Sequence, residues 1–175
     1  MLLVYKNLKI RNAVAKDAQI LCNWWNNGEI MAHAGFPNGL NTNVKKIIHE
    51  LSADSDDTYR RLIIEIDDIP SGEMRFRNKQ NNVAEIGIKI CESSEQEKGY
   101  GTLLIKMLIS YLFANGYEKI ILDTNTKNTR AQHVYEQIGF QRLRVNHDSW
   151  RNQLGELQSS VDYELLKPQF TPIEF

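Results

Sequence analysis

The sequence lacks the features that mark disulfide-rich, metal-binding and membrane-spanning chains. It has only two cysteines among 175 residues, Cys22 and Cys91, which lie far apart and among apolar neighbours. Disulfide frameworks and zinc sites need clustered or repeated cysteines, so we interpret both as buried free thiols in a reducing compartment. The four histidines show no metal-ligand spacing, and we predict no metal site. The longest apolar stretch, 103–113, contains Lys106 and is too short to span a bilayer.

An excess of charge of one sign is also missing. Lysine and arginine number 21, aspartate and glutamate 22, so the formal net charge is −1. No global basic field is present to attract nucleic acid or an anionic membrane, and we expect neither partner. The first ten residues lack a charged region followed by an apolar stretch and a cleavage site, which predicts no secretion signal. We therefore expect a cytoplasmic protein.

The first half of the chain shows helical and then strand patterns. No repeat, low-complexity segment or Pro/Gly/Ser-rich linker divides the chain, and its length predicts one domain over 1–175. Alternation predicts a first strand, and helical spacing then predicts two helices separated by a loop. Two strands follow around the turn residues Asp67-Asp68 and Pro70-Ser71-Gly72, which together indicate a hairpin. The predicted segments are a strand at 8–11, a helix at 15–25, a loop at 29–43, a helix beginning after 43, and strands at 61–66 and 74–77.

The second half alternates strands with helices. After Gly99-Tyr100-Gly101 comes the clearest helix of the chain, which ends at Asn115-Gly116 with glycine as its cap. The other predicted segments are strands at 83–90, 119–123, 140–146 and 161–166, and a helix at 129–138. Hairpins followed by a βαβ unit predict an α/β (α+β) fold. We expect a mixed, largely antiparallel sheet of about seven strands, flanked by about four helices.

The segment with the most chemical information leads from the strand at 83–90 into the long helix. Helix N-termini leave amides unpaired and carry partial positive charge, so a pyrophosphate bound there accepts several backbone hydrogen bonds. Gly99 and Gly101 let the main chain approach such a group closely. Two common phosphate motifs fail, because position 104 is leucine rather than glycine and no Gly-Lys-Ser/Thr follows. Taken alone, Gly-x-Gly before a helix is equally compatible with an ordinary tight turn.

A second motif turns this local signal into a family resemblance. Gln-x-x-Gly-x-Gly after an apolar strand resembles the acetyl-CoA loop of the GNAT superfamily of N-acetyltransferases. The segment 128–140 is similar to the second signature of that family, through Asn128, Ala131, Tyr135, Gly139 and Phe140. The resemblance covers roughly residues 60–142. The Trp-Asn that follows the first helix and the Tyr-Glu-x-x-Gly-Phe ending resemble the branch with ribosomal-protein N-terminal and aminoglycoside acetyltransferases.

The resemblance implies acetyl-CoA as co-substrate and assigns residues to it. The backbone of Ile88 and Ile90 would bind the pantetheine arm, which inserts like an extra strand. Asn128 and Ala131 would line the cofactor channel. The amides of one loop would hold the pyrophosphate: Gln96, Glu97, Lys98, Gly99, Tyr100, Gly101 and Thr102. The loop departs from the family pattern, since Gln96 stands where arginine is usual and Glu97-Lys98 adds little net charge, so backbone amides would carry the affinity.

The resemblance also implies proton-transfer residues. Transfer needs an uncharged amine and a proton for the departing thiolate. Tyr135 matches the usual acid of the family; packing under the sheet is the alternative. Glu85 matches the base of histone-modifying members, and burial is expected to raise its pKa toward neutrality, with a solvent-facing position as the alternative. Glu73 is the second candidate base. We interpret Cys91 as a packing residue rather than a nucleophile.

The acceptor is not identified by the sequence. The expected acceptor loops are 26–43 and 147–157, which contain aromatic side chains suited to a small-molecule amine or a peptide or protein N-terminus. Part of the acidic region 54–73 is a hypothetical attractor of a cationic acceptor, with a solvated surface as the alternative. The function is predicted to be acetyl transfer to a primary amine by direct attack in a ternary complex. The alternative is a non-catalytic acyl-CoA-binding regulatory module, and a homodimer is left open.

Overall fold

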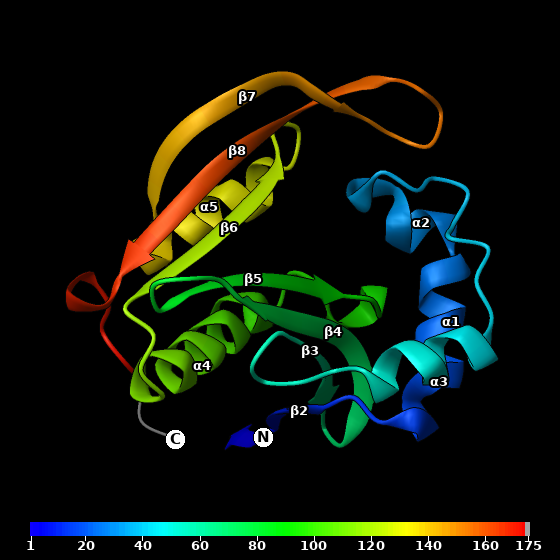
Figure 1. Cartoon of the computed structure of the whole chain (residues 1–175), viewed down its shortest axis with the longest axis horizontal. Coiled ribbons are helices and arrows are strands. Elements are labelled where there is room, and N and C mark those ends of the chain that lie inside the picture. The colour runs from blue at the N-terminus through cyan, green and yellow to red at the C-terminus, as the bar shows by residue number, and fades with distance from the viewer. Residues whose placement is uncertain (174–175) are drawn as a thin grey trace.

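The computed structural model of the chain describes residues 1–173. Within these residues the strands form one sheet of eight, in the order β1-β2-β3-β4-β5-β6-β8-β7 (Figure 1). The strands are β1 (Leu2–Tyr5), β2 (Leu8–Asn12), β3 (Tyr59–Ile66), β4 (Ile69–Asn78), β5 (Val83–Ile90), β6 (Lys119–Asn125), β7 (Gln141–Arg151) and β8 (Leu157–Leu166). All neighbours pair antiparallel except β5 and β6. The predicted mixed, largely antiparallel fold is confirmed, with β1 as a further strand.

Helices cover both faces of the sheet. The α-helices are α1 (Ala18–Asn26), α2 (Gly28–Met31), α3 (Val44–Ser52), α4 (Tyr100–Ala114) and α5 (Thr129–Ile138). Alternation along β3 separates the two sides, because Leu62 and Ile64 join one buried cluster while Ile63 joins the other. The first cluster contains α4 and Tyr135 of α5, and the second contains residues of α1 and α3. The sheet is thus sandwiched between α4 and α5 on one side and α1 and α3 on the other.

Strands β5 and β6 separate soon after they begin to pair. Their parallel register covers only three residue pairs, from Val83↔Lys119 to Glu85↔Ile121. The rest of β5 pairs with β4 on the other side, and within residues 1–173 no strand pairs with it on the side of β6. Figure 1 shows the two strands diverging, with the β7–β8 hairpin arching over the gap toward α2. The sheet therefore opens at the centre, at the end where β5 leads into α4.

The chain path differs in detail from the sequence predictions. The β3–β4 turn is made by Asp67 and Asp68 alone, both at positive φ (51° and 64°), and 70–72 already belongs to β4. A shift in the register between Ile64 and Glu65 accommodates that longer strand. The segment predicted as a loop at 29–43 contains the short helix α2, whose first amides are capped by Asn27. Within residues 1–173, no helix combines the length and apolarity needed to cross a membrane.

Candidate active site

A cleft of about 1080 Å³ occupies the opening of the sheet. Residues predicted for a cofactor line one end of it: Ile88, Ile90, Gln96, Gly101, Asn128 and Ala131. The other end is lined by Trp25, His33, Arg61, Glu73, Arg75 and Trp150. Tyr135 and Asp123 line the same cleft. We call these the cofactor end and the acceptor end. The fold therefore brings together two motifs that lie far apart in the sequence.

The N-terminus of α4 opens onto the cofactor end without a side-chain cap. Gly99 is the N-cap residue, at φ +79°, and no side chain accepts a hydrogen bond from the first-turn amides. A Cβ at Gly101 would meet only the Cδ1 of Ile90, at 3.9 Å, so the protein itself does not fill the space there. Free amides, a positive helix end and open space together suit an anionic group.

Gln96 and Asn128 are held by contacts within the protein. The Gln96 side chain donates from Nε2 to the carbonyl of Ile90 at 2.9 Å, which ties the loop to the end of β5. Asn128 is the N-cap of α5, and its Oδ1 accepts from the amide of Ala131 at 3.2 Å. Asn128 therefore has a capping role in the fold, and it lines the cleft from that position.

Two cations near the cofactor end have carboxylate neighbours, whereas Lys127, which lines the cleft, has no ion-pair partner among residues 1–173. Lys98 pairs with Glu95 at 3.1 Å, and Arg130 at the start of α5 pairs with Glu97 at 3.0 Å. The Arg130–Glu97 pair is exposed, and ion pairs of this kind contribute little to stability. The loop thus presents little net positive charge through its side chains, as its sequence suggested. Its backbone amides remain the main donors.

Tyr135 is buried at the floor of the cleft with its ring packed edge-on against Tyr163, the centroids 5.7 Å apart. Burial, reinforced by the charge of Asp123 and by Tyr163, raises the pKa of Tyr135 to about 12. Among residues 1–173, no side chain or carbonyl makes a hydrogen bond to its phenol oxygen. The phenol therefore stays protonated near neutral pH and has a free donor for a group in the cleft.

Glu85 does not have the environment that the sequence predicted. Burial raises its pKa, but hydrogen bonds and charge from Lys79 and Arg75 outweigh that effect, so the pKa of Glu85 lies below its usual value. The ion pairs are 2.9 Å to Lys79 and 3.0 Å to Arg75. The expectation of a raised pKa was wrong, because the neighbouring strand β4 and the turn after it supply two cations. Glu85 is also not among the residues that line the cleft.

Glu73 lies at the acceptor end, and both of its carboxylate oxygens are engaged. Oε2 accepts from the indole of Trp25 at 2.9 Å, and Oε1 accepts from Lys89 at 3.1 Å. Trp25 comes from α1 and Lys89 from β5, so Glu73 links the helix to the sheet. It faces the cleft in the position of a candidate base, but with a structural role of its own.

Asp123 is a cleft residue that the sequence reasoning missed. It lies on β6 just beyond the three residues that pair with β5. Burial raises its pKa, and the charges of Asp162 and Glu85 raise it further, against an opposing effect of Arg75. Its own backbone amide lowers the pKa slightly, and its carboxylate has no hydrogen-bond or ion-pair partner in another residue of 1–173. In the sequence, the feature that could have identified Asp123 was its place at the end of a predicted strand. That it faces a cleft follows only from the separation of β5 and β6 in the structure.

The two segments predicted to bind the acceptor meet across the mouth of the cleft. The second, predicted as a loop at 147–157, is a loop only at 152–156, because β7 continues to Arg151 and β8 begins at Leu157. Gln153 donates from Nε2 to the carbonyl of Gly39 at 2.9 Å, and its Oε1 accepts from the amide of Asn38 at 2.8 Å. The ring of Trp150 lies against Gly35, where an added Cβ would come within 2.4 Å of the indole. Two segments more than 100 residues apart thus form one rim.

The acidic region of 54–73 is dispersed and largely paired. Five of its carboxylates form ion pairs: Asp54 with Arg61, Asp56 with Arg60, Glu65 with Arg11, Asp68 with Lys9 and Glu73 with Lys89. Most of these pairs lie outside the cleft, whose lining includes Glu73 as the one carboxylate residue of 54–73. The region is therefore not a continuous acidic field at the acceptor end, and the hypothesis that part of it attracts a cationic acceptor stays a prediction for Glu73 alone.

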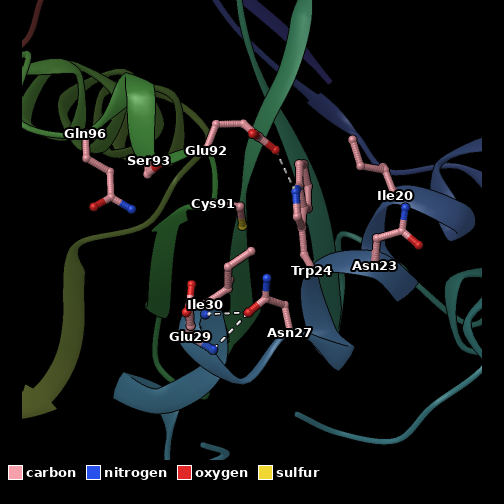
Figure 2. A pocket seen from close by; sticks show the side chains of 10 residues that line it. All are labelled: Ile20, Asn23, Trp24, Asn27, Glu29, Ile30, Cys91, Glu92, Ser93 and Gln96. Carbon is pink, nitrogen blue, oxygen red and sulfur yellow. Dashed lines mark hydrogen bonds between the residues drawn. The ribbon is translucent and has the colours of Figure 1, made fainter. Parts of the chain in front are cut away.

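A smaller pocket of about 510 Å³ lies beside the cleft, between α1, α2 and the segment after β5 (Figure 2). Trp24 donates to Glu92 at 3.0 Å on one side of it, and Asn27 caps α2 on the other. Cys91 lies between these groups, and burial raises the pKa of its thiol well above the usual range. A protonated, buried thiol is a poor nucleophile, in agreement with its interpretation as a packing residue.

Comparison with known families agrees with this geometry. Residues 7–141 match the model of the acetyltransferase (GNAT) domain, which covers more than half of the chain. The protein therefore belongs to the GNAT acetyltransferase family. A search of curated proteins finds no match.

Solved structures with the same fold cover nearly the whole chain. A probable acetyltransferase is 24% identical with a TM-score of 0.82, and the alignment covers 97% of this chain and 99% of the other. A spermidine N-acetyltransferase from Vibrio cholerae, in complex with CoA and spermine, is 22% identical with a TM-score of 0.81, covering 94% and 98%. RimL, a ribosomal L7/L12 α-N-protein acetyltransferase in complex with CoA, is 14% identical with a TM-score of 0.84, covering 95% and 98%. At these identities the likeness shows a common fold.

Proposed function

We propose that the protein transfers an acetyl group from acetyl-CoA to a primary amine, by direct attack within a ternary complex. The observation that carries the proposal is the single cleft that joins the uncapped N-terminus of α4 to Tyr135 and Asp123. One end suits a pyrophosphate and the middle holds a free proton donor and a free carboxylate. The CoA in two structural neighbours supports the same cofactor.

In this proposal the cofactor is held mainly by the backbone. The free edge of β5 at Ile88 and Ile90 would pair with the pantetheine arm, since no strand occupies that side. The first-turn amides of α4 would bind the pyrophosphate, with Gly101 leaving the space for it. Ala131 would line the channel opposite. An acetyl-CoA bound this way would extend along the splayed edge of the sheet, toward the middle of the cleft.

The transfer requires one bond to form and one to break at the thioester carbonyl. The amine nitrogen attacks the carbonyl carbon, the C–S bond breaks, and the CoA thiolate leaves. The amine loses a proton, which Asp123 would accept because its carboxylate is free and faces the cleft. Glu73 faces the same cleft but is already bound to Trp25 and Lys89. The role of Glu85 as a base remains a prediction from the sequence.

Tyr135 would act as a hydrogen-bond donor to the leaving sulfur. Its pKa of about 12 keeps the phenol protonated, but it makes full transfer to a thiolate, whose thiol has a pKa of about 8.5, unfavourable. A donated hydrogen bond stabilises the developing negative charge without that transfer. The proposal therefore refines the acid role predicted from the sequence.

The experiment combines a binding and a transfer measurement. Calorimetry with CoA should show saturable binding, and incubation with acetyl-CoA and a panel of amines should release free thiol with one class of acceptor. Absence of CoA binding would contradict the cofactor assignment. CoA binding without thiol release for any amine would instead indicate the non-catalytic alternative.

A further inference from the structure

The floor of the acceptor end presents three cations from neighbouring strands. Arg61 of β3 lies opposite Arg75 of β4, Arg75 lies opposite Gly87 of β5, and Lys89 stands two residues further along β5. All three basic side chains line the cleft. They lie close to where the acetyl group of the proposed acetyl-CoA would be. A cation among them that lacks a partner within the protein is therefore available to bind the acceptor.

Two of these cations are fully engaged within the protein. Arg61 donates from Nη1 to Asp54 and from Nη2 to Glu50, and its guanidinium lies over the ring of Tyr59 at 4.9 Å. Lys89 is held by Glu73 at 3.1 Å. An adjacent carboxylate neutralises the positive charge of each, so neither is well placed to bind an anionic ligand.

Arg75 is different because most of its donors are unused. Nη1 donates to Glu85 at 3.0 Å, but Nε and Nη2 have no hydrogen-bond partner among residues 1–173. Glu85 also serves Lys79 at 2.9 Å, so one carboxylate is shared by two cations. The side chain of Arg75 is 37% exposed, against 18% for Arg61. It is therefore the most available guanidinium on the floor of the cleft.

Gly87 allows Arg75 to lie flat across the floor. A Cβ at Gly87 would come within 3.0 Å of Nε and 3.3 Å of Cγ of Arg75, so a larger residue would displace the arginine. The glycine and the Glu85 contact together fix the guanidinium at the point where β5 parts from β6. A fixed guanidinium with free N–H groups is suited to a carboxylate or phosphate.

We propose that Arg75 binds an anionic group of the acceptor, so that the substrate class is an amine that also carries a carboxylate or a phosphate. Asp123, on the opposite strand of the opening, would receive the amine end of the same molecule. The proposal rests on the acetyltransferase function proposed above. Polyamines carry no anionic group for Arg75, so the proposal does not expect them as preferred acceptors.

The test uses pairs of amines that differ in whether they carry an anionic group. Dipeptide amides Ala-Glu and Ala-Gln form a carboxylate pair, phosphoserine amide and serine amide form a phosphate pair, and spermidine is the polycation. We expect kcat/KM to be higher for the anionic member of at least one pair than for its neutral isostere and for spermidine. Arg75→Gln should reduce that preference by roughly tenfold or more, because a charge-assisted contact is lost. Lys79 still neutralises Glu85 in that variant.

Arg77→Gln is the control, because Arg77 lies on the same strand and the same side but does not line the cleft. It should leave the preference unchanged, and calorimetry should show that both variants bind CoA like the wild type. The proposal is overturned if the protein binds CoA but prefers spermidine or the neutral amines, or acetylates no anionic amine, or keeps its preference in Arg75→Gln. Loss of CoA binding by the wild type would instead contradict the proposed function itself.

Discussion

The two ends of the cleft make their contacts with different parts of the polypeptide. The cofactor end is built from backbone groups and small residues: the free edge of β5, the α4 amides, Gly101 and Ala131. The acceptor end is built from long side chains of several elements, among them Trp25 of α1, Arg75 of β4 and Trp150 of β7. A backbone site tolerates many sequences, whereas a side-chain site changes with each substitution. Substitutions at the acceptor end can therefore change which acceptor binds while the cofactor end stays the same.

The largest effect is expected in the middle of the cleft, where the two ends meet. Tyr135→Phe should lower kcat about 10²-fold or more, because one donor to the developing charge is lost. CoA affinity, measured by calorimetry, should stay within about twofold, since the backbone contacts remain. Tyr163→Phe is the matched control, because its phenol donates to Glu136 at 2.9 Å and does not line the cleft. An unchanged rate in Tyr135→Phe would remove this residue from the mechanism.

Asp123→Asn should lower kcat/KM about 10²-fold and abolish the acid limb of its pH profile, since the base is lost. The pKa of Asp123 is raised, so the folded protein binds this proton more tightly than the unfolded chain. Ionised Asp123 therefore costs stability at neutral pH, and that cost disappears as the pH falls through its folded pKa. Asp123→Asn should accordingly show a slightly raised Tm at pH 7 and no such gain in acid.

Asp162→Asn is a second test of Asp123 as the base. Asp162 lies opposite Asp123 in the sheet, and its charge raises the pKa of Asp123. Removing that charge should move the acid limb of kcat/KM to lower pH while leaving the plateau rate largely intact. A limb that stays in place would show that it belongs to another group.

At the cofactor end, Gly101→Asp places an anion beside the predicted phosphate position. CoA binding should weaken by about tenfold or more through like-charge repulsion and loss of space. Thermal stability should not fall, because an acidic side chain in the first turn of a helix is favourable. Ser94→Asp, which adds the same charge in the preceding loop, is the control and should change CoA affinity much less. Equal effects of the two variants would contradict a phosphate site at α4.

At the acceptor end, two glycines in the left-handed region allow a matched pair. Gly35→Ala and Gly155→Ala both strain the backbone, at φ +94° and +79°, by about 1 kcal/mol. Only Gly35→Ala also collides with Trp150, since nothing lies within 4 Å of a Cβ at Gly155. We expect Gly35→Ala to raise the acceptor KM several-fold without changing CoA affinity. Equal acceptor KM values in the two variants would show that Trp150 has no role in acceptor binding.

The smallest effect is expected for Glu85→Gln. Its carboxylate is bound to Lys79 and Arg75 away from the cleft lining, so kcat/KM should stay within about twofold for a neutral amine. Because the pKa of Glu85 is lowered, its contribution to stability is present above its unfolded pKa and is lost as the pH falls through the folded pKa. The variant should therefore lose less stability on acidification than the wild type. A large loss of rate would restore Glu85 as a candidate base.

Local sequence patterns predicted most of the fold and the helix N-terminus at the cofactor end. The strand at 83–90, Gly99, Gly101 and the helix after them are neighbours in the chain, so their arrangement follows from short-range rules. Short, exposed β1 was missed because four residues beside a turn at Lys6 give little alternation to detect. The 70–72 segment was misread as a turn because the register shift opposite it allows proline and glycine within a strand.

The remaining features depend on contacts between distant segments. The pKa of Glu85 is set by Arg75 and Lys79, and the exposure of Asp123 to the cleft is set by where β5 leaves β6. A single sequence specifies which side chains exist but not which charges meet across a sheet. By itself, then, this sequence predicted a helix N-terminus suited to an anion, because backbone amides at a helix end are a local property, and acetyl-CoA was inferred from the resemblance of its two motifs to the GNAT family. Only the tertiary structure determined the candidate base and the charges that face the acceptor, because electrostatic environments are created by long-range packing.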